Sequence, residues 1–271
     1  MPVNLHRPTR WKTDIAMSVD MYNQWFMNFA PQAFRLTRIR TTKDVESSLK
    51  LTEYLTNIRP EILRTNPEIL ATLRMSTCPP LAVDRLIGLA NASPALVKRM
   101  ELEKKLPSRM TTANIDRELA KISRIIEVMI DPDIFVWLGR AKLPTRNETH
   151  RAATIVADRL CGAVANPIIR NAQEKRQLAS IKAWLEARGY IHVLPGEGMR
   201  FNAMPPGSFS FRMNVPVKLE GGIRTINIPV DAAIMPKNAK IGSLPVFLEA
   251  KSAGDFTNTN KRRKEEAVKM A

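Results

Sequence analysis

The chain has 271 residues, 44% of them hydrophobic, which fits one large domain or two modest ones and excludes a disordered tail. Its 42 lysines and arginines outnumber 26 aspartates and glutamates, and the resulting net charge of +16 favours nucleic acid as a partner. Two cysteines and three scattered histidines provide neither a disulfide framework nor zinc-ligand spacing. Charged residues interrupt the longest apolar stretches, so we expect a cytoplasmic protein without a membrane span.

From Trp11 to about Gly189 the sequence is typical of helices and poor in glycine. Apolar residues recur at helical spacing, and Thr42 followed by Glu46 predicts a capped helix start. Prolines between residues 60 and 94 divide the early part into short pieces. The longer helices are expected at 42–54, 113–130, 146–165 and 166–188.

After Gly189 the pattern changes to short strands separated by turn residues, and the chain returns to helix from about Asn258. This order predicts an α+β protein. A helical region, residues 1–160, precedes an α/β module, residues 161–271, in which helices flank a mixed sheet. The strands are expected at 190–194, 208–217, 223–234 and 245–251.

Charged residues end two otherwise apolar strands of this module. Alternation along residues 225–231 places Asp231 on the face opposite Ile228 and Val230. The same alternation along residues 245–251 places Glu249 and Lys251 together on one face. If the two strands are hairpin neighbours, the two carboxylates and the ammonium converge at one end of the sheet.

Hydrolysis of a phosphodiester requires such a set of groups. Two carboxylates, with carbonyls and waters, form the oxygen-rich pocket that Mg²⁺ prefers. The ion offsets charge on the phosphate and activates a bound water. A neighbouring ammonium, here that of Lys251, orients this water and offsets the charge of the transition state.

A Glu-x-Lys tripeptide by itself is weak evidence, because charged residues alternate on many solvated strands. In this chain both strands are otherwise apolar, and unpaired charge is costly to bury. Together with the excess of basic residues, the pattern therefore favours a nuclease over a structural role for these charges.

The amino-acid sequence resembles the XamI-type family of type II restriction endonucleases, within the PD-(D/E)xK nuclease superfamily. The resemblance covers nearly the whole chain. It is carried by Pro229-Val-Asp231 with Glu249-Ala-Lys251 and by the distinctive segment that follows them, and further by AVANPIIRNAQEKRQLASIKAWLEARGY (163–190), MSTCPP (75–80), VDRL (83–86) and MIDPDIFVWL (129–138).

This resemblance implies Mg²⁺-dependent cleavage of double-stranded DNA at a short palindrome, GTCGAC for the family. It further implies a homodimer and a protective methyltransferase within a restriction-modification system. Asp231, Glu249 and the Ala250 carbonyl would be metal ligands, and Lys251 the base that positions the nucleophile. Residues 1–160 would serve DNA recognition or dimerisation, and residues 161–271 would be the catalytic core. Because only residues 252–271 follow the lysine, we expect this core to be incomplete at its C-terminus.

Two further groups of residues are candidates for the site. Glu174, in the helix before the first strand, would join the metal site or its second shell, although an ordinary solvated position is equally compatible with the sequence. The segment after Lys251 would open a helix whose N-terminus and basic cluster bind DNA phosphates. Not all of its basic residues can face one way; the candidates are Asn258, Asn260, Lys261, Arg262, Arg263 and Lys264.

Two alternative functions remain open from the sequence. A repair or recombination nuclease with the same core would prefer flaps, junctions or lesions to a specific duplex sequence. A DNA-binding protein that does not cleave would bind in a salt-dependent way, and its binding would not require the carboxylate of Asp231.

Overall fold

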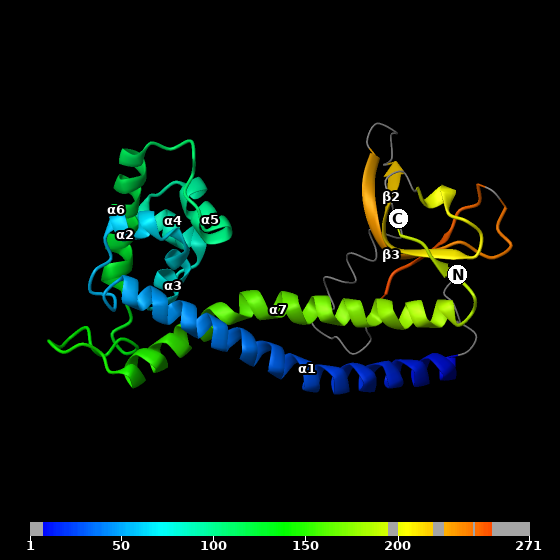
Figure 1. Cartoon of the computed structure of the whole chain (residues 1–271), viewed down its shortest axis with the longest axis horizontal. Helices are drawn as coiled ribbons and strands as arrows, with labels where there is room; N and C mark the ends of the chain where they lie inside the picture. The colour runs from blue at the N-terminus through cyan, green and yellow to red at the C-terminus, as the bar shows by residue number, and fades with distance from the viewer. Residues whose placement is uncertain (1–7, 195–199, 219–224, 241, 251–271) are drawn as a thin grey trace. The chain divides into compact units, whose positions relative to one another are not determined.

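The computed structural model describes residues 8–194, 200–218, 225–240 and 242–250 (Figure 1). They form two compact units: a helical unit, residues 30–168, and a sheet unit, which combines residues up to 29 with those from 169 onward. The helical unit therefore ends close to the expected division at residue 160, whereas the first residues of the chain group with the sheet.

The expected α+β organisation is confirmed, with helices first and a mixed sheet last. Two long helices, α1 and α7, each contribute residues to both units. Short helices α2 to α6 lie together in the helical unit (Figure 1). The helices are α1 (Pro8–Leu51), α2 (Pro60–Thr65), η1 (Pro67–Ile69), α3 (Leu70–Met75), α4 (Val83–Ala90), α5 (Pro94–Glu103), α6 (Thr112–Met129) and α7 (Arg146–Glu186).

Helix α6 is central to the core of the helical unit, and it contacts α2 and α4. Its residues Ile115, Leu119, Ile122 and Ile126 recur at helical spacing, and all four are buried. The Thr111 side chain caps the helix by accepting a hydrogen bond from the Asn114 backbone N–H at 3.4 Å. The helix expected at 113–130 is thus confirmed.

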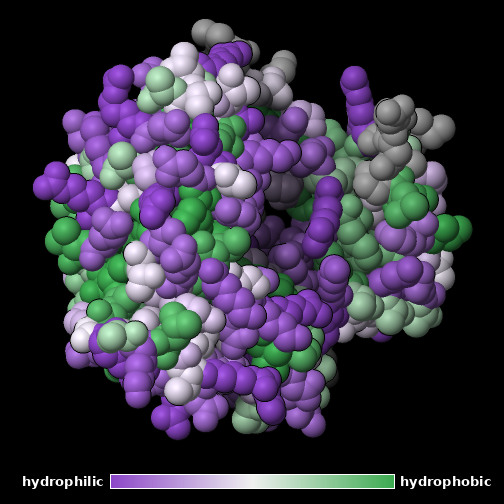
Figure 2. Space-filling model, turned by 60° about the vertical axis from the view of Figure 1, so that its left-hand side comes forward, coloured by the Kyte–Doolittle hydropathy of each residue, from purple (hydrophilic) through white to green (hydrophobic). Residues whose placement is uncertain are grey.

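Hydrophilic residues cover most of the face seen in Figure 2, with hydrophobic ones in scattered patches.

Two expected helix boundaries are wrong. Thr42 lies inside α1, where its hydroxyl donates to the Arg38 carbonyl at 2.8 Å instead of capping a helix start. The helices expected at 146–165 and 166–188 are one helix, α7, which continues through Pro167. A proline inside a helix costs about 3 kcal/mol. Packing of buried neighbours such as Ala165 and Leu178 offsets this cost, and a local sequence pattern does not show such packing.

One helix in the described part of the chain, α7, is long and apolar enough to cross a membrane by length and composition alone. Its most apolar window has a mean hydropathy of 1.3, and a third of that window is buried within the protein. The core helix of a soluble protein has the same properties, so a single such helix is weak evidence for a membrane span.

A capping box begins α7. The Thr145 backbone N–H donates to Glu148 Oε2 at 2.7 Å, and the Glu148 N–H donates back to Thr145 Oγ1 at 3.3 Å. Arg140 Nη2 donates to the same carboxylate at 2.6 Å. The hydrogen bond from Arg140, followed by those from Thr145, lowers the pKa of Glu148 to about 2.

Replacement of Glu148 by glutamine should reduce the acid sensitivity of the fold. Because the folded-state pKa lies below the unfolded one, Glu148 contributes stability above pH 4.5 that is lost as pH falls toward 2. Thermal melting from pH 5 to pH 2 should therefore show a shallower fall for Glu148→Gln than for the wild type. Glu127→Gln, at an exposed position on α6, is the matched control and should keep the wild-type slope.

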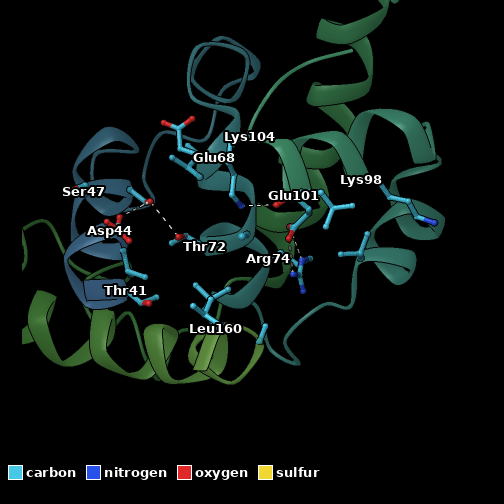
Figure 3. A pocket seen from close by; sticks show the side chains of 18 of the residues that line it. Thr41, Asp44, Ser47, Glu68, Thr72, Arg74, Lys98, Glu101, Lys104 and Leu160 are labelled. Atoms are coloured by element: carbon cyan, nitrogen blue, oxygen red, sulfur yellow. Dashed lines mark hydrogen bonds and ion pairs between the residues drawn. The ribbon is translucent and has the colours of Figure 1, made fainter. Parts of the chain in front are cut away.

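A buried ion pair joins α3 to α5. Arg74 Nε and Nη2 donate to the two carboxylate oxygens of Glu101 at 2.9 and 3.0 Å, and the two side chains are only 9% and 10% exposed. The Arg74 guanidinium also donates to the Leu81 carbonyl. Figure 3 shows the pair at the edge of a cavity of about 820 Å³ in the helical unit.

Loss of one partner of this pair should destabilise the protein strongly. Glu101→Ala leaves the Arg74 charge buried without its carboxylate, which typically costs about 3–5 kcal/mol. Glu103→Ala removes the exposed partner of Arg99 from the same helix and should cost less than about 1 kcal/mol. Urea unfolding measures both values, and equally small losses in the two variants would contradict the prediction.

The described residues of the sheet unit form four strands in the order β1-β2-β3-β4. β1 (Ile191–His192) is parallel to β2 (Ser208–Lys218), whereas β2 with β3 (Thr225–Ile234) and β3 with β4 (Val246–Leu248) are antiparallel. A short helix, η2 (Phe201–Ala203), precedes β2. All four expected strands are confirmed, with ends shifted by up to three residues. Buried Met204, Met213, Ala233 and Met235 form the core of this unit.

The ends of the two long helices that belong to the sheet unit contact each other. The Arg176 guanidinium of α7 lies 5.2 Å from the centre of the Trp25 ring and donates to the Met21 carbonyl at 3.5 Å. Trp25 stacks on Phe29 with ring centres 5.3 Å apart. This contact fixes the part of α7 that carries Glu174 beside α1.

Candidate active site

The pairing of β3 with β4 brings the two predicted carboxylates together. The ladder ends with Ala232 opposite Leu248, so Asp231 and Glu249 are the next residues beyond this pair, and both side chains line one cavity. Asp231 is half-buried, and Ala232 and Ala233, which follow it, are completely buried. The hairpin relation that the sequence analysis required is therefore present.

A hydrogen bond fixes the Asp231 carboxylate against the segment that leaves β4. The Ala250 backbone N–H donates to Asp231 Oδ2 at 2.7 Å. A bond from a neutral donor to a charged acceptor at this distance is among the stronger hydrogen bonds in proteins. The acid of one strand is thereby tied to the residue that follows Glu249.

Five charged side chains, three acids and two cations, line one cavity beside these strands. It has a volume of about 490 Å³ and lies between α7, β2, β3 and the end of β4. Asp231 and Glu249 line it, and so do Glu174 of α7 and Arg212 of β2. Lys175, Asn171, Pro229 and Val230 complete the lining. Glu174 thus lies in the same cavity as the two predicted metal ligands.

Arg212 was not predicted from the sequence. Its Nη2 donates to Glu174 Oε1 at 2.7 Å. The backbone of Arg212 has a φ of +53°, a left-handed conformation that costs a residue with a Cβ about 1–2 kcal/mol. The available signal was a charged residue directly between the apolar Phe211 and Met213 of the strand.

The groups present fit a magnesium ion. Carboxylate and carbonyl oxygens are its preferred ligands, and one or two protein carboxylates usually suffice because the ion keeps several waters. No group of three or more histidine, cysteine, aspartate or glutamate side chains that could hold a metal exists within the described ranges. A site formed by Asp231, Glu249 and a backbone carbonyl is compatible with that finding.

Several predicted residues lie outside the described part of the chain. These are Lys251 and the DNA-binding candidates Asn258, Asn260, Lys261, Arg262, Arg263 and Lys264. The described chain ends at Ala250, directly before Lys251. The structure therefore places both predicted carboxylates in the cavity and leaves the predicted lysine as an expectation.

Comparison with known proteins gives the class of enzyme. The XamI restriction endonuclease family matches residues 53–271. The Type II restriction enzyme SalI of Streptomyces albus G is 50% identical over 268 residues, which cover 99% of this chain and 84% of that relative. No solved structure matches the chain. The chain belongs to the XamI restriction endonuclease family and is a type II restriction endonuclease, as the sequence analysis expected.

Proposed function

We propose that this protein hydrolyses phosphodiester bonds of double-stranded DNA in a Mg²⁺-dependent reaction at the cavity that Asp231 and Glu249 line. The observation that carries the proposal is the meeting of these two carboxylates across β3 and β4 in a member of a restriction endonuclease family. Phosphodiester cleavage uses such a pair of acids to hold a metal ion at the scissile phosphate.

Each residue of the site has a distinct role in this proposal. Asp231, Glu249 and the Ala250 carbonyl would hold Mg²⁺, whose chemistry is to offset charge on the phosphate and to activate a bound water. The Ala250 N–H keeps the Asp231 carboxylate oriented toward this position. Lys251 would position the attacking water, and Glu174 would support the metal site from its second shell.

The class of enzyme supports proposals for the location, oligomeric state, target site and partner of this protein. We propose that the protein acts in the cytoplasm as a homodimer, because a palindromic site presents the same bases to each of two identical subunits. GTCGAC is the proposed site. A cognate DNA methyltransferase would protect the host's own copies of it. The residues from Asn258 to Lys264 would contact DNA phosphates next to the catalytic lysine.

A basic groove in the helical unit supports DNA binding by that part of the chain. It has a volume of about 960 Å³ and is lined by Arg38, Lys43 and Lys50 of α1 and Arg146 of α7. Glu46 is the one acidic residue of its lining, and it contacts His150 at 2.7 Å. Lys43, Lys50 and Arg146 are exposed. Arg38 is paired with Asp158 at 3.1 Å, so the three exposed cations are the groups that suit the phosphate backbone of a duplex.

The first experiment is cleavage of plasmid DNA with Mg²⁺ or with EDTA. The wild type should give discrete fragments only with Mg²⁺, and mapping of their ends identifies the target. Asp231→Asn, Glu249→Gln and Lys251→Ala should each reduce the rate by at least roughly 10²-fold, the effect of one lost electrostatic contact at a reacting centre.

Asp133→Asn, an exposed acid of the helical unit, is the matched control and should cut at the wild-type rate. Preference for flaps or junctions over a duplex sequence would favour the repair-nuclease alternative. DNA binding without cleavage by the wild type, unchanged in Asp231→Asn, would replace the proposal by a DNA-binding protein.

The basic groove can be tested by binding alone. In EDTA, the triple variant with alanine at positions 43, 50 and 146 should bind duplex DNA more weakly. Its plot of log K against log salt concentration should be shallower by roughly 2–3, since each lost phosphate contact removes about 0.9 from the slope. The control places alanine at exposed Lys105, Arg109 and Arg117, which removes the same charge outside the groove. Equal slopes in the two triple variants would remove the groove from the DNA interface.

A further inference from the structure

Arg212 interrupts the pairing of β2 with β3 at the position that faces Asp231. The ladder has Phe211 opposite Ala232 and Met213 opposite Val230, so the register is the same on both sides. The pair between them, Arg212 with Asp231, is missing from the ladder although both residues belong to the described strands. No residue is inserted, and the distortion is confined to Arg212, whose φ is +53°.

A strained backbone persists only where its surroundings determine it, and such residues cluster at functional sites. Glycine or asparagine would adopt this conformation more easily than arginine. At this position the backbone conformation is one that arginine disfavours, so the sequence and the local structure conflict. Functional sites are the places where such conflicts are expected.

Arg212 shares its cavity with three acids and one other cation, Lys175. Glu174, which it contacts at 2.7 Å, lines the same cavity as Asp231 and Glu249. The side chain of Arg212 is 57% exposed, so the guanidinium remains accessible from the cavity and from solvent. Its planar fork of donors matches the oxygens of a phosphate better than a lysine ammonium does.

We propose that Arg212 is a further catalytic residue, which binds the non-bridging oxygens of the scissile phosphate. Its left-handed backbone and its ion pair with Glu174 hold the guanidinium at the cavity. Glu174 is then a positioning residue that acts through Arg212, and this role replaces direct support of the metal site. This inference rests on the proposed function, because it requires a phosphodiester to enter the cavity of Asp231 and Glu249.

The test compares Arg212→Gly with Arg212→Ala in single-turnover cleavage and thermal melting. Both variants lose the guanidinium and should cut roughly 10²–10³-fold more slowly with Mg²⁺. Glycine tolerates the positive φ, so Arg212→Gly should melt at least as high as Arg212→Ala. Arg212→Lys keeps the charge without the fork and should retain an intermediate rate. Lys182→Ala breaks an exposed α7 ion pair outside the cavity and should cut like the wild type.

DNA binding in EDTA separates a phosphate contact from a structural role. Arg212→Gly should reduce the slope of log K against log salt concentration by about 1, whereas a structural residue leaves the slope unchanged. Adding Glu174→Gln to Arg212→Gly should cause no further loss of rate, since Glu174 acts through Arg212. A further loss would overturn the positioning role of Glu174.

Two outcomes distinguish failure of this inference from failure of the proposed function. A wild type that cuts with Mg²⁺, together with a folded Arg212→Gly that cuts equally fast, overturns the role of Arg212 alone. A wild type that does not cut DNA under any tested metal condition overturns both.

Discussion

The antiparallel pairing of β3 with β4 is the constraint on which the candidate site depends. It ends at Ala232–Leu248, so that Asp231 and Glu249 come next in the two segments and line one cavity, and the Ala250 N–H donates to Asp231 Oδ2 at 2.7 Å. Two acids that are close together repel each other, and this arrangement is tolerable where donors or cations offset the charge. The Ala250 N–H and the Arg212 guanidinium supply such groups among the described residues.

The same cavity depends on helix α7, which provides Glu174. The sequence predicted that the helix would break at Pro167, before Glu174. Instead α7 continues through the proline, so Glu174 lies within one long helix. Its contact with α1, through Arg176 and Trp25, holds that part of the helix within the sheet unit. The site therefore combines one long helix with a small sheet, and the strained Arg212 joins the two by its ion pair with Glu174.

Much of the fold was predictable because it follows from local patterns. The periodic apolar residues of α6 and the short apolar runs of β2 and β3 marked these elements, and the α+β order was predicted from them. The boundaries at Thr42 and Pro167 were predicted wrongly. Thr42 and Pro167 each favour the end of a helix locally, but each lies inside a longer helix. Packing of the residues before and after them stabilises that helix.

The sequence by itself determined that this protein is a basic chain of the XamI restriction endonuclease family, and it predicted Asp231, Glu249 and Lys251 for phosphodiester chemistry. The prediction that Glu249 and Lys251 share one face of their strand rests on the periodicity of two along a strand, which is a local property. Only the tertiary structure decided that β3 and β4 are neighbours, that Glu174 shares their cavity and that Arg212 has a strained backbone beside them. These facts depend on contacts between residues far apart in the chain, which no local pattern specifies.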